Sequence, residues 1–265
     1  MRKPNQLKQR LKAGEAVFGP WCVIPSPTIT NIVGAAGMDF AIIDLEHGPT
    51  GFKTAENMIR AADSEGCSSI IRLGTISETD ILKSLDIGAQ GILVAHVESA
   101  DDARRVVEHA KYHPLGRRGF SPYTRAGGYG STGIENHTIR ENEQTLVGII
   151  IEGRKGIDAI EEIARVPGLD LIYIGAYDLS QALGMPGHVR HPEVRACLER
   201  CMGLIRKAGL IPGGYVARNQ EDMEWMLSIG MQFITFLPDV TIFSDTCKNA
   251  VEDFRKSVQA RKDAI

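Results

Sequence analysis

Short apolar segments rich in valine and isoleucine recur along this 265-residue chain, and each is followed by a segment with helical spacing and a glycine or proline break. The apolar segments are continuous rather than alternating, as expected for parallel strands that are covered on both faces. The alternation therefore predicts eight strand–helix units. The predicted strands are Ala16–Ile24, Phe40–Asp44, Ser68–Leu73, Gly91–His96, Leu146–Glu152, Leu169–Ile174, Ile211–Val216 and Phe233–Leu237.

Helical segments fill the gaps between these strands, and no proline- or serine-rich linker divides the chain. We therefore predict that residues 1–265 form a single α/β domain, a (β/α)8 TIM barrel. A doubly wound sheet is the alternative, but it normally has a GxGxxG turn after its first strand, where this chain reads IPSPTIT. The predicted helices are Pro27–Ala36, Lys53–Ser64, Glu78–Leu85, Ala100–Lys111, Gly156–Arg165, Pro192–Ala208, Gln220–Leu227 and Ile242–Arg261.

One segment, His113–Glu143 between the fourth and fifth strands, does not follow the alternation. It contains HPLGRRGFSPYTRAGGYGSTG and is rich in glycine, arginine and aromatic residues. Loops of this length are usually functional or mobile. We expect a long active-site loop near residues 113–143, at the mouth of the barrel.

The charge and cysteine content exclude several classes of function. The chain has 30 basic and 33 acidic side chains, a net charge of −3, which argues against nucleic acid or an anionic membrane as the main partner. None of the 5 cysteines forms the CxxC pair of a zinc or redox motif. No run of about 18 apolar residues occurs, and the basic N-terminus lacks the apolar core of a signal peptide. We predict a cytoplasmic protein.

Ionisable residues cluster at the carboxyl ends of the predicted strands, where the catalytic groups of a (β/α)8 barrel lie. Strand two ends in IIDLEHG and strand six runs into GAYDLS, while the fourth strand ends in a histidine that could be structural beneath the opening. These side chains are predicted to meet at one opening of the barrel. They are Asp44, Glu46, His47, Arg72, His96, Glu152 and Asp178.

Glu152 and Asp178 follow adjacent strands and would repel each other unless a cation lies between them. Two protein carboxylates suit Mg²⁺ or Mn²⁺, which keep water ligands and leave positions for a chelating substrate. Each carboxylate could instead cap the N-terminus of the helix that follows it. The sequence thus indicates a candidate divalent-metal site.

Arg72 would emerge from a buried strand end, which is costly for a charge unless an anion meets it there. A salt bridge to Asp44 or Asp86 that only locks the barrel is the alternative. His47 lies in a tight turn, and its pKa range suits proton transfer near neutral pH, although a loop histidine taken alone is more often inert. No lysine ends a predicted strand, which weakens a Schiff-base mechanism.

Six motifs occur in the order and spacing of the HpcH/HpaI aldolase family, the metal-dependent class II pyruvate aldolases, and the chain resembles this family over roughly residues 5 to 255. The motifs are IIDLEHGP, IIRL, LKSLDIGAQGILV, HPLGRRG, IEG and GAYDLSQALG. The resemblance implies a (β/α)8 barrel whose C-terminal helix is exchanged between subunits of a homo-oligomer, a hexamer or a trimer. It also implies a carbon–carbon lyase that reversibly cleaves a 4-hydroxy-2-oxo acid to pyruvate and an aldehyde.

The resemblance implies a role for each motif residue. Glu152 and Asp178 match the metal ligands for Mg²⁺ or Mn²⁺, with Co²⁺ as a further candidate. Arg72 matches the arginine that binds the 2-oxo acid, and His47 matches the catalytic base. Positive charge from the metal and the arginine would then lie where negative charge develops as the carbon–carbon bond breaks.

Further residues enter through the same resemblance. Asp44 and Asp86 match acidic residues that orient the histidine and the nearby loops, and Ala176 and Tyr177 fall in the substrate-binding turn. The chain departs from the family at Ile150, where a glutamine is usual, and at Tyr177, where the usual motif is Gly-Pro-Ala-Asp. These departures leave the metal and the enolate chemistry in place. They open an alternative, a condensing synthase or a decarboxylase that acts on oxaloacetate or a related 2-oxo acid.

Overall fold

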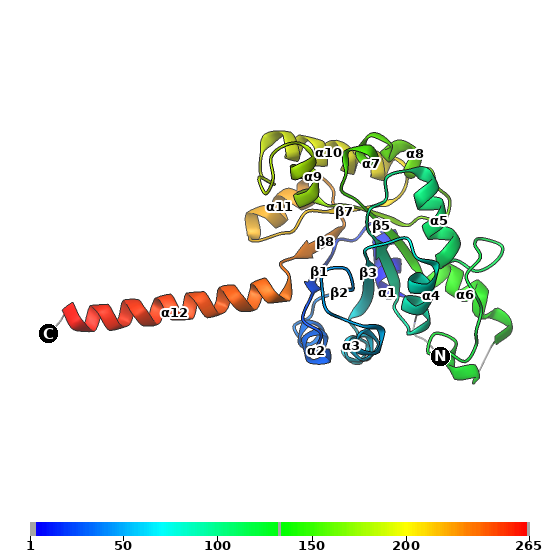
Figure 1. The fold of residues 1–265 in the computed structure, drawn as a ribbon, viewed down its shortest axis with the longest axis horizontal. Coiled ribbons are helices and arrows are strands. Elements are labelled where there is room, and N and C mark those ends of the chain that lie inside the picture. The colour runs from blue at the N-terminus through cyan, green and yellow to red at the C-terminus, as the bar shows by residue number, and fades with distance from the viewer. Residues whose placement is uncertain (1–3, 132–133, 264–265) are drawn as a thin grey trace.

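The computed structural model describes residues 4–131 and 134–263. Eight parallel strands follow one another around a closed barrel, and the last strand pairs with the first (Figure 1). All eight predicted strands are present, so the prediction of a (β/α)8 barrel is confirmed. The strands are β1 Val17–Cys22, β2 Phe40–Asp44, β3 Ser68–Leu73, β4 Gly91–Val94, β5 Leu146–Ile151, β6 Leu171–Ile174, β7 Ile211–Gly214 and β8 Phe233–Phe236.

Helices lie outside the strands, and each predicted helical segment contains one, although Gly156–Arg165 falls on two short helices that meet at Ala159. The matching helices are α2 Pro27–Ala35, α3 Phe52–Ser64, α4 Glu78–Asp86, α5 Ala100–Ala110, α7 Arg154–Asp158, α8 Ile160–Ile163, α10 Pro192–Lys207, α11 Gln220–Ser228 and α12 Asp239–Asp263. The remaining helical elements, which the sequence did not predict, are α1 Gln6–Lys12, η1 Gly128–Gly130, η2 Ile134–Asn136, α6 His137–Gln144 and α9 Ala176–Ala182. Most of these are too short to show a helical period in the sequence.

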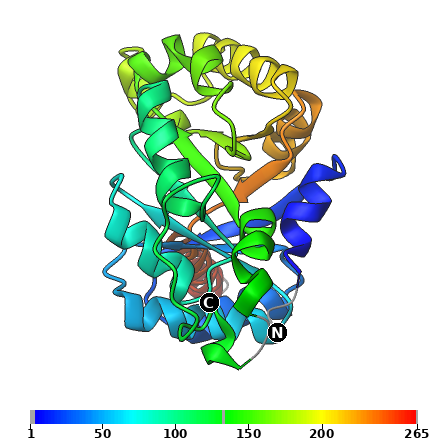
Figure 2. The ribbon, with the colours of Figure 1, turned by 90° about the vertical axis from the view of Figure 1, so that its right-hand side faces the viewer.

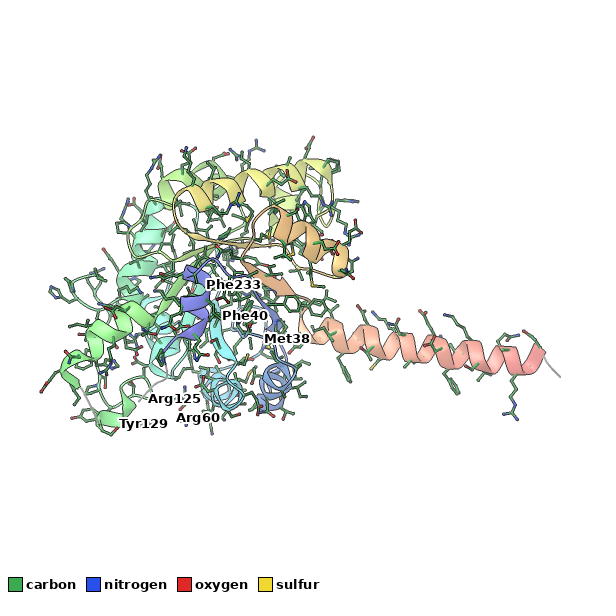
Figure 3. The ribbon with its side chains drawn as sticks, turned by 180° about the vertical axis from the view of Figure 1, so that it is seen from behind. Met38, Phe40, Arg60, Arg125, Tyr129 and Phe233 are labelled. Carbon is green, nitrogen blue, oxygen red and sulfur yellow. The ribbon has the colours of Figure 1, made fainter. Side chains whose placement is uncertain are left out.

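The strands carry apolar side chains on both faces, which gives the protein two packed layers. Inside the barrel, the rings of Phe40 and Phe233 stack with their centroids 4.1 Å apart (Figure 3). Outside it, the alternate strand residues pack against the helices in a single larger cluster. The filled interior fixes the strand ends, so side chains that project from those ends have rigid supports.

Helix α1 closes the amino-terminal end of the barrel. Leu7 and Leu11 are buried in the interior cluster. The Asn5 side chain caps the helix by accepting from the backbone N–H of Lys8, and its Nδ2 donates to the carbonyls of Gln90 and Gln144 at 2.8 Å each. Helix α1 therefore covers the interior cluster of the barrel at its amino-terminal end.

Segment 113–143 does not lie over the carboxyl ends of the strands of its own barrel, where the sequence led us to expect it. It follows the C-terminus of α5 and precedes β5, so it runs along the amino-terminal end. Arg125 pairs there with Asp63 at 2.5 Å, and Arg60 donates to the Tyr129 hydroxyl at 2.9 Å (Figure 3). The sequence analysis predicted the helix before this segment, and that helix returns the chain from the carboxyl end of β4 to the amino-terminal end of the barrel.

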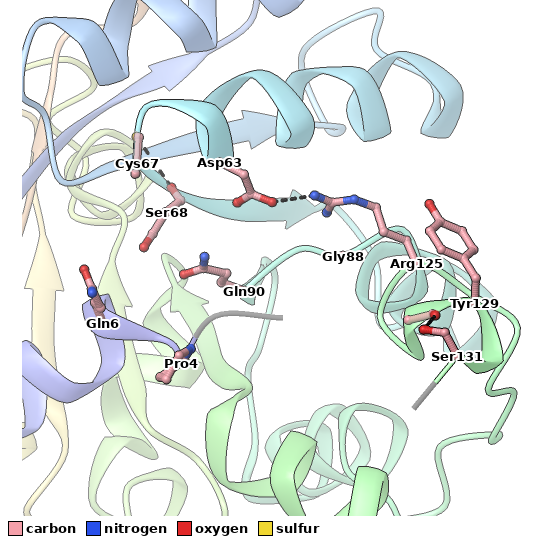
Figure 4. A pocket seen from close by; sticks show the side chains of 12 residues that line it. Pro4, Gln6, Asp63, Cys67, Ser68, Gly88, Gln90, Arg125, Tyr129 and Ser131 are labelled. Carbon is pink, nitrogen blue, oxygen red and sulfur yellow. Dashed lines mark hydrogen bonds and ion pairs between the residues drawn. The ribbon is translucent and has the colours of Figure 1, made fainter. Parts of the chain in front are cut away.

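A cavity of about 480 Å³ opens where this segment meets the barrel (Figure 4). It is lined by the start of β3 together with Arg125 and Tyr129, and Gln90 projects towards it from the loop before β4. Two charged residues of its wall, Arg125 and Asp63, form an ion pair with each other. The cavity lies at the amino-terminal end of the barrel, remote from the strand ends that carry the candidate site.

Helix α12 leaves the barrel and extends away from it as a rod, which Figure 2 shows end-on (Figures 1 and 2). Its apolar side chains recur at intervals of three or four residues and are exposed to solvent, for example 68% for Phe243 and 70% for Phe254. In the part of the chain that the structure describes, no helix is long and apolar enough to span a bilayer.

Candidate active site at the carboxyl ends of the strands

Asp44 and Arg72 form the buried base of the site. They are paired across β2 and β3, and Arg72 Nε donates to Asp44 Oδ1 at 2.9 Å while Nη2 donates to Oδ2. The guanidinium also lies 4.6 Å from the centroid of the Trp21 ring. Burial would raise the pKa of Asp44, but the hydrogen bonds and charge of Arg72 outweigh it and lower that pKa. Asp44 is therefore held as a carboxylate that fixes the arginine.

The turn after β2 wraps around the same carboxylate. The backbone N–H groups of Glu46 and His47 donate to Asp44 Oδ1 at 2.9 and 3.1 Å, which is an aspartate-initiated turn. Glu46 Oε2 lies 3.2 Å from Arg72 Nη1. The turn leaves the imidazole of His47 exposed at the mouth. Asp44 thus fixes the turn that carries His47 through backbone hydrogen bonds and at the same time holds Arg72.

His96 joins this group to the fifth strand. Its Nε2 is 2.9 Å from Glu46 Oε1, and its Nδ1 is 2.6 Å from Glu152 Oε1. The backbone N–H of His96 also donates to Glu152 Oε1 at 3.2 Å. An unbroken series of polar contacts therefore runs from β2 through β3 and the loop after β4 to the end of β5.

Glu152 and Asp178 lie close enough for their charges to interact. Burial raises the pKa of Glu152, and the negative charges of Asp178 and Glu46 raise it further, while His96 opposes them. Asp178 is exposed in the first turn of α9. The prediction that these two carboxylates meet is consistent with this coupling, and their roles stay a proposal.

The close approach of β5 to α9 depends on Gly175. A Cβ at this position would lie 2.9 Å from the Cβ of Glu152 and 3.2 Å from its Oε2. Only glycine leaves room for the glutamate side chain here, and α9 begins at the next residue, Ala176. The sequence therefore brings the second carboxylate oxygen of Glu152 to the start of the helix that carries Asp178.

The turn that starts α9 supplies the two remaining predicted residues. Ala176 is buried as the first residue of the helix, and Tyr177 is 43% exposed beside Asp178. The Tyr177 hydroxyl accepts a hydrogen bond from Arg218 Nη2 at 3.2 Å, across the mouth from the loop after β7. Tyr177 thus borders the space above the carboxylates.

The family model described as HpcH/HpaI aldolase/citrate lyase matches residues 18–245, which include all of these side chains. The chain belongs to this family. A hydroxypyruvate/pyruvate aldolase from Sagittula stellata is 34% identical over 238 residues, which are 90% of this chain and 93% of that protein. A 5-keto-4-deoxy-D-glucarate aldolase from Klebsiella pneumoniae is 30% identical over 253 residues, covering 96% and 98%.

Solved structures agree with this assignment. The HpcH/HpaI aldolase from Desulfitobacterium hafniense matches with a TM-score of 0.89 at 29% identity, covering 94% of this chain and 96% of that one. The citrate synthase SbnG matches with a TM-score of 0.87 at 30% identity, covering 96% and 98%. The prediction of a carbon–carbon lyase of the aldolase type is confirmed for this member of the HpcH/HpaI family.

Asp86 is the one predicted site residue that the fold of this HpcH/HpaI protein does not bring to the mouth. It is the last residue of α4, a helix that returns from the carboxyl end of β3 to the amino-terminal end of β4. There it accepts from Arg118 Nη2 at 2.7 Å. The family resemblance implies that Asp86 helps to orient the histidine and the nearby loops, and within its own chain Asp86 anchors segment 113–143.

Two residues contribute more than the sequence suggested. The sequence predicts Glu46 at the opening without a role, and it leaves open that His96 is structural beneath it. His96 is in fact exposed at the mouth. The sequence carried a signal for both residues. Glu46 lies in the same turn as Asp44, and His96 is the last residue of the predicted strand beside the one that ends in Glu152.

Proposed function

We propose that this member of the HpcH/HpaI family catalyses the reversible aldol cleavage of a 4-hydroxy-2-oxo acid into pyruvate and an aldehyde. The observation that carries the proposal is the arrangement around Arg72, whose guanidinium is fixed by Asp44 and Glu46 at the end of the barrel that also holds Glu152. An oriented cation beside a carboxylate pair suits an anionic 2-oxo acid. The relatives at 34% and 30% identity are both named as aldolases.

We propose that Glu152 and Asp178 hold a divalent cation, Mg²⁺ or Mn²⁺, with Co²⁺ as a further candidate. The negative charge of Asp178 contributes to the raised pKa of Glu152, so the two carboxylates would be stabilised by a cation between them. Gly175 leaves the space beside Glu152 Oε2 open. Among residues 4–131 and 134–263, no three or more His, Cys, Asp or Glu side chains are grouped to hold a metal ion. A pair of oxygen ligands rather than a closed cage fits cations that keep water or substrate ligands.

When bound, such a cation would supply positive charge where the oxo acid becomes an enolate. Arg72 would hold the anionic end of the substrate and stabilise the same developing charge. His47 would remove the proton from the 4-hydroxyl group, the C3–C4 bond would break with its electron pair passing into the enolate, and the aldehyde would leave. Protonation of C3 then gives pyruvate. Ala176 and Tyr177 would border the substrate, since they lie at the start of α9 next to Asp178.

A second candidate function is favoured by two side chains at the mouth. Ile150 is buried inside the barrel two residues before Glu152, and Tyr177 adds a hydroxyl beside Asp178. Neither residue is Arg72 or a proposed metal ligand, so both would change the surroundings of the substrate and leave the enolate chemistry in place. A synthase or decarboxylase that acts on oxaloacetate would use the same enolate, and the similar structure of SbnG is named as a citrate synthase.

Proton exchange separates these possibilities. Pyruvate, the protein and Mg²⁺ or Mn²⁺ are combined in deuterium oxide, and the methyl signal is followed by NMR. The proposal expects exchange that a chelator abolishes, together with release of pyruvate from a 4-hydroxy-2-oxo acid. Exchange without such release, but with turnover of oxaloacetate, would favour the second function. Absence of exchange with every metal would contradict both.

We further propose that the chain forms a homo-oligomer, a hexamer or a trimer, in which α12 is exchanged between subunits. The helix contacts its own barrel chiefly at β1 and carries an uncovered apolar stripe, namely Val240, Phe243, Cys247, Val251, Phe254 and Val258. Ile32 on α2 and Leu227 on α11 are 57% and 50% exposed on the two helices that flank the position an eighth barrel helix normally occupies. A second copy of α12 is the occupant whose apolar stripe would cover these exposed side chains.

In the same assembly, segment 113–143 would line the active site of a neighbouring subunit. It lies at the amino-terminal end of its own barrel, so it could line an active site only by reaching a neighbouring subunit. Leu115 and Tyr123 are 58% and 77% exposed on it, which leaves apolar surface for such a contact. The prediction that this segment is an active-site loop therefore depends on the oligomer. The same holds for the prediction that Asp86 orients the histidine and the nearby loops.

A further inference from the structure

His96 contacts both halves of the candidate site, and the contacts are unequal. Its side chain meets Glu46 through Nε2 and Glu152 through Nδ1, and the shorter contact, 2.6 Å, is with Glu152. We propose that His96 is a positioning residue that fixes the carboxylate of Glu152 for cation binding, by holding Oε1 and leaving Oε2 directed at the start of α9. This inference rests on the proposed metal site and assigns to it a residue outside the ligand pair.

The backbone of His96 supports the proposal. The residue has a φ of +58°, in the left-handed region that residues other than glycine rarely adopt. In this conformation its N–H and its ring Nδ1 both reach Glu152 Oε1, at 3.2 and 2.6 Å. A strained conformation persists where surrounding contacts over-determine it, and such strain is typical of functional sites. At His96, the two contacts with Glu152 Oε1 stabilise this strained backbone conformation.

The other oxygen of Glu152 is left on the side where a cation would bind. Oε2 faces the position that a Cβ of Gly175 would fill, at 3.2 Å, and α9 with Asp178 begins directly after that glycine. Carboxylate ligands in metal sites are commonly held by hydrogen bonds to their second oxygen, and the loss of such a partner typically weakens metal affinity about 10- to 100-fold. The contact between His96 and Oε1 has this form.

The contact with Glu46 holds the ring in place. Glu46 Oε1 lies 2.9 Å from His96 Nε2, and Glu46 Oε2 lies 3.2 Å from Arg72 Nη1. Gly74 allows this arrangement, because a Cβ there would lie 2.8 Å from Glu46 Cγ. The imidazole is thus fixed at both nitrogens, although 61% of its side chain is exposed. Its orientation is set by the two carboxylates rather than by burial.

Three substitutions separate the two ring contacts. His96→Asn keeps a donor near the position of Nδ1 and tolerates the left-handed backbone, so it can still hold Glu152. His96→Gln places its donor near the position of Nε2 and can reach only Glu46. His96→Ala keeps neither donor. His188, which is exposed in the loop after α9, gives the matched control His188→Ala.

The test measures binding of Mn²⁺ to the metal-stripped full-length protein by electron paramagnetic resonance, with circular dichroism to verify folding. We expect His96→Ala and His96→Gln to raise the Kd for Mn²⁺ about 10-fold or more, and His96→Asn to stay within about threefold of the unmodified protein. His188→Ala should leave the Kd unchanged. A Kd for His96→Ala within twofold of the unmodified value, or rescue by Gln but not by Asn, would overturn the inference.

Two further readouts distinguish the possible failures. A directly bound histidine nitrogen in the electron spin-echo spectrum of the Mn²⁺ complex would overturn the positioning role, because His96 would then be a ligand. If the unmodified protein binds Mn²⁺ and exchanges the methyl protons of pyruvate while the His96 variants bind equally well, only the inference about His96 fails. If the unmodified protein does neither, the proposed function fails and the inference falls with it.

Discussion

Arg72 Nε lies 2.9 Å from Asp44 Oδ1, and the two residues face each other in the register of β2 and β3. The side chains are 12% and 2% exposed, so both charges are largely removed from water. Glu46 adds a third charge to the pair. The packed interior fixes both strands, so the contact with Asp44 holds the guanidinium in one position at the carboxyl end of the barrel. This pair therefore links the stability of the barrel to the proposed binding of the 2-oxo acid.

The first prediction concerns this pair. Asp44→Asn should lower the free energy of unfolding by about 3 kcal/mol, since it leaves a buried arginine without its main partner. Arg72→Lys keeps the charge but loses the forked geometry, and we expect kcat/KM for aldol cleavage to fall about 100-fold. Urea denaturation and a coupled pyruvate assay measure the two effects.

A control for this prediction exists at the same end of the barrel. Glu98 pairs with Lys155 at 3.3 Å, but these side chains are 49% and 81% exposed. Glu98→Gln should change the stability by less than about 1 kcal/mol, because exposed ion pairs contribute little. Equal losses for Asp44→Asn and Glu98→Gln would contradict the buried role of Asp44.

The barrel and most of the site could be predicted because both depend on local patterns. Continuous apolar runs marked the strands, and polar residues at their carboxyl ends had to meet once the barrel closed. Asp44, Arg72 and Glu152 follow this logic. Asp86 does not, since it was assigned from a motif alone and lies at the end of a helix.

The remaining features depend on three-dimensional detail that no short pattern encodes. The left-handed backbone of His96 and the space above Gly175 decide which oxygen of Glu152 is held and which is free. The position of segment 113–143, in contrast, follows from the predicted helix Ala100–Lys111 before it, because a helix that follows a barrel strand returns the chain to the amino-terminal end. The exchange of α12 between subunits stays a proposal, because within its own chain the helix contacts the barrel chiefly at β1 and its apolar stripe is exposed.

His47 should be required for bond cleavage. Its imidazole is exposed at the mouth, and the turn that carries it is fixed by two backbone hydrogen bonds to Asp44. We expect His47→Ala to lower kcat for cleavage of a 4-hydroxy-2-oxo acid at least about 100-fold, with little change in KM. Steady-state kinetics beside His188→Ala provide the comparison, and an unchanged kcat would exclude His47 as the base.

Removal of the cation should abolish the reaction reversibly. A chelator should reduce cleavage by about 10³-fold, and Mg²⁺, Mn²⁺ or Co²⁺ should restore it to different extents. Glu152→Gln and Asp178→Asn should each produce a similar loss that added metal restores only in part, whereas Glu98→Gln should respond like the unmodified protein. Full activity in the chelated enzyme would contradict the role of the carboxylate pair.

Lys111 makes the stability of the amino-terminal end depend on pH. Its ammonium donates to the carbonyls of Asn142 and Thr145 at 2.7 and 3.0 Å. Burial, aided by the charge of Lys8, lowers the pKa of Lys111 to about 7. In the unfolded chain the lysine keeps its proton up to its ordinary pKa of 10.5, so the unfolded state binds more protons between these values. Raising the pH through this window should therefore favour the folded state.

The measurement compares the unmodified protein with Lys111→Met between pH 6 and 9. The difference in the free energy of unfolding should be constant below about pH 7 and should then shift in favour of the unmodified protein by up to about 1.4 kcal/mol per pH unit. The exposed Lys207 gives the control Lys207→Met, for which the difference should not change with pH. A flat difference for Lys111→Met would show that this lysine stays protonated in the folded state.

The apolar stripe of α12 gives the last prediction. Phe243 and Phe254 are 68% and 70% exposed on this helix, which contacts its own barrel mainly at β1. If a second copy covers them, Phe243→Glu combined with Phe254→Glu should dissociate the oligomer, because two charges would be buried in an apolar contact. Light scattering after size exclusion measures the mass.

Asn249 lies on the opposite side of α12 from the stripe and gives a control with the same type of charge change. Asn249→Glu should leave the oligomer intact, so that loss of assembly in the double variant cannot be attributed to added charge alone. Pyruvate exchange measured on the dissociated protein then tests segment 113–143. Exchange that survives while cleavage is lost would place a neighbour's segment at the aldehyde end of the site, because the contacts of Arg72 and Glu152 lie within one chain. A monomeric unmodified protein would instead rule out both the exchange of α12 and any role of that segment in catalysis.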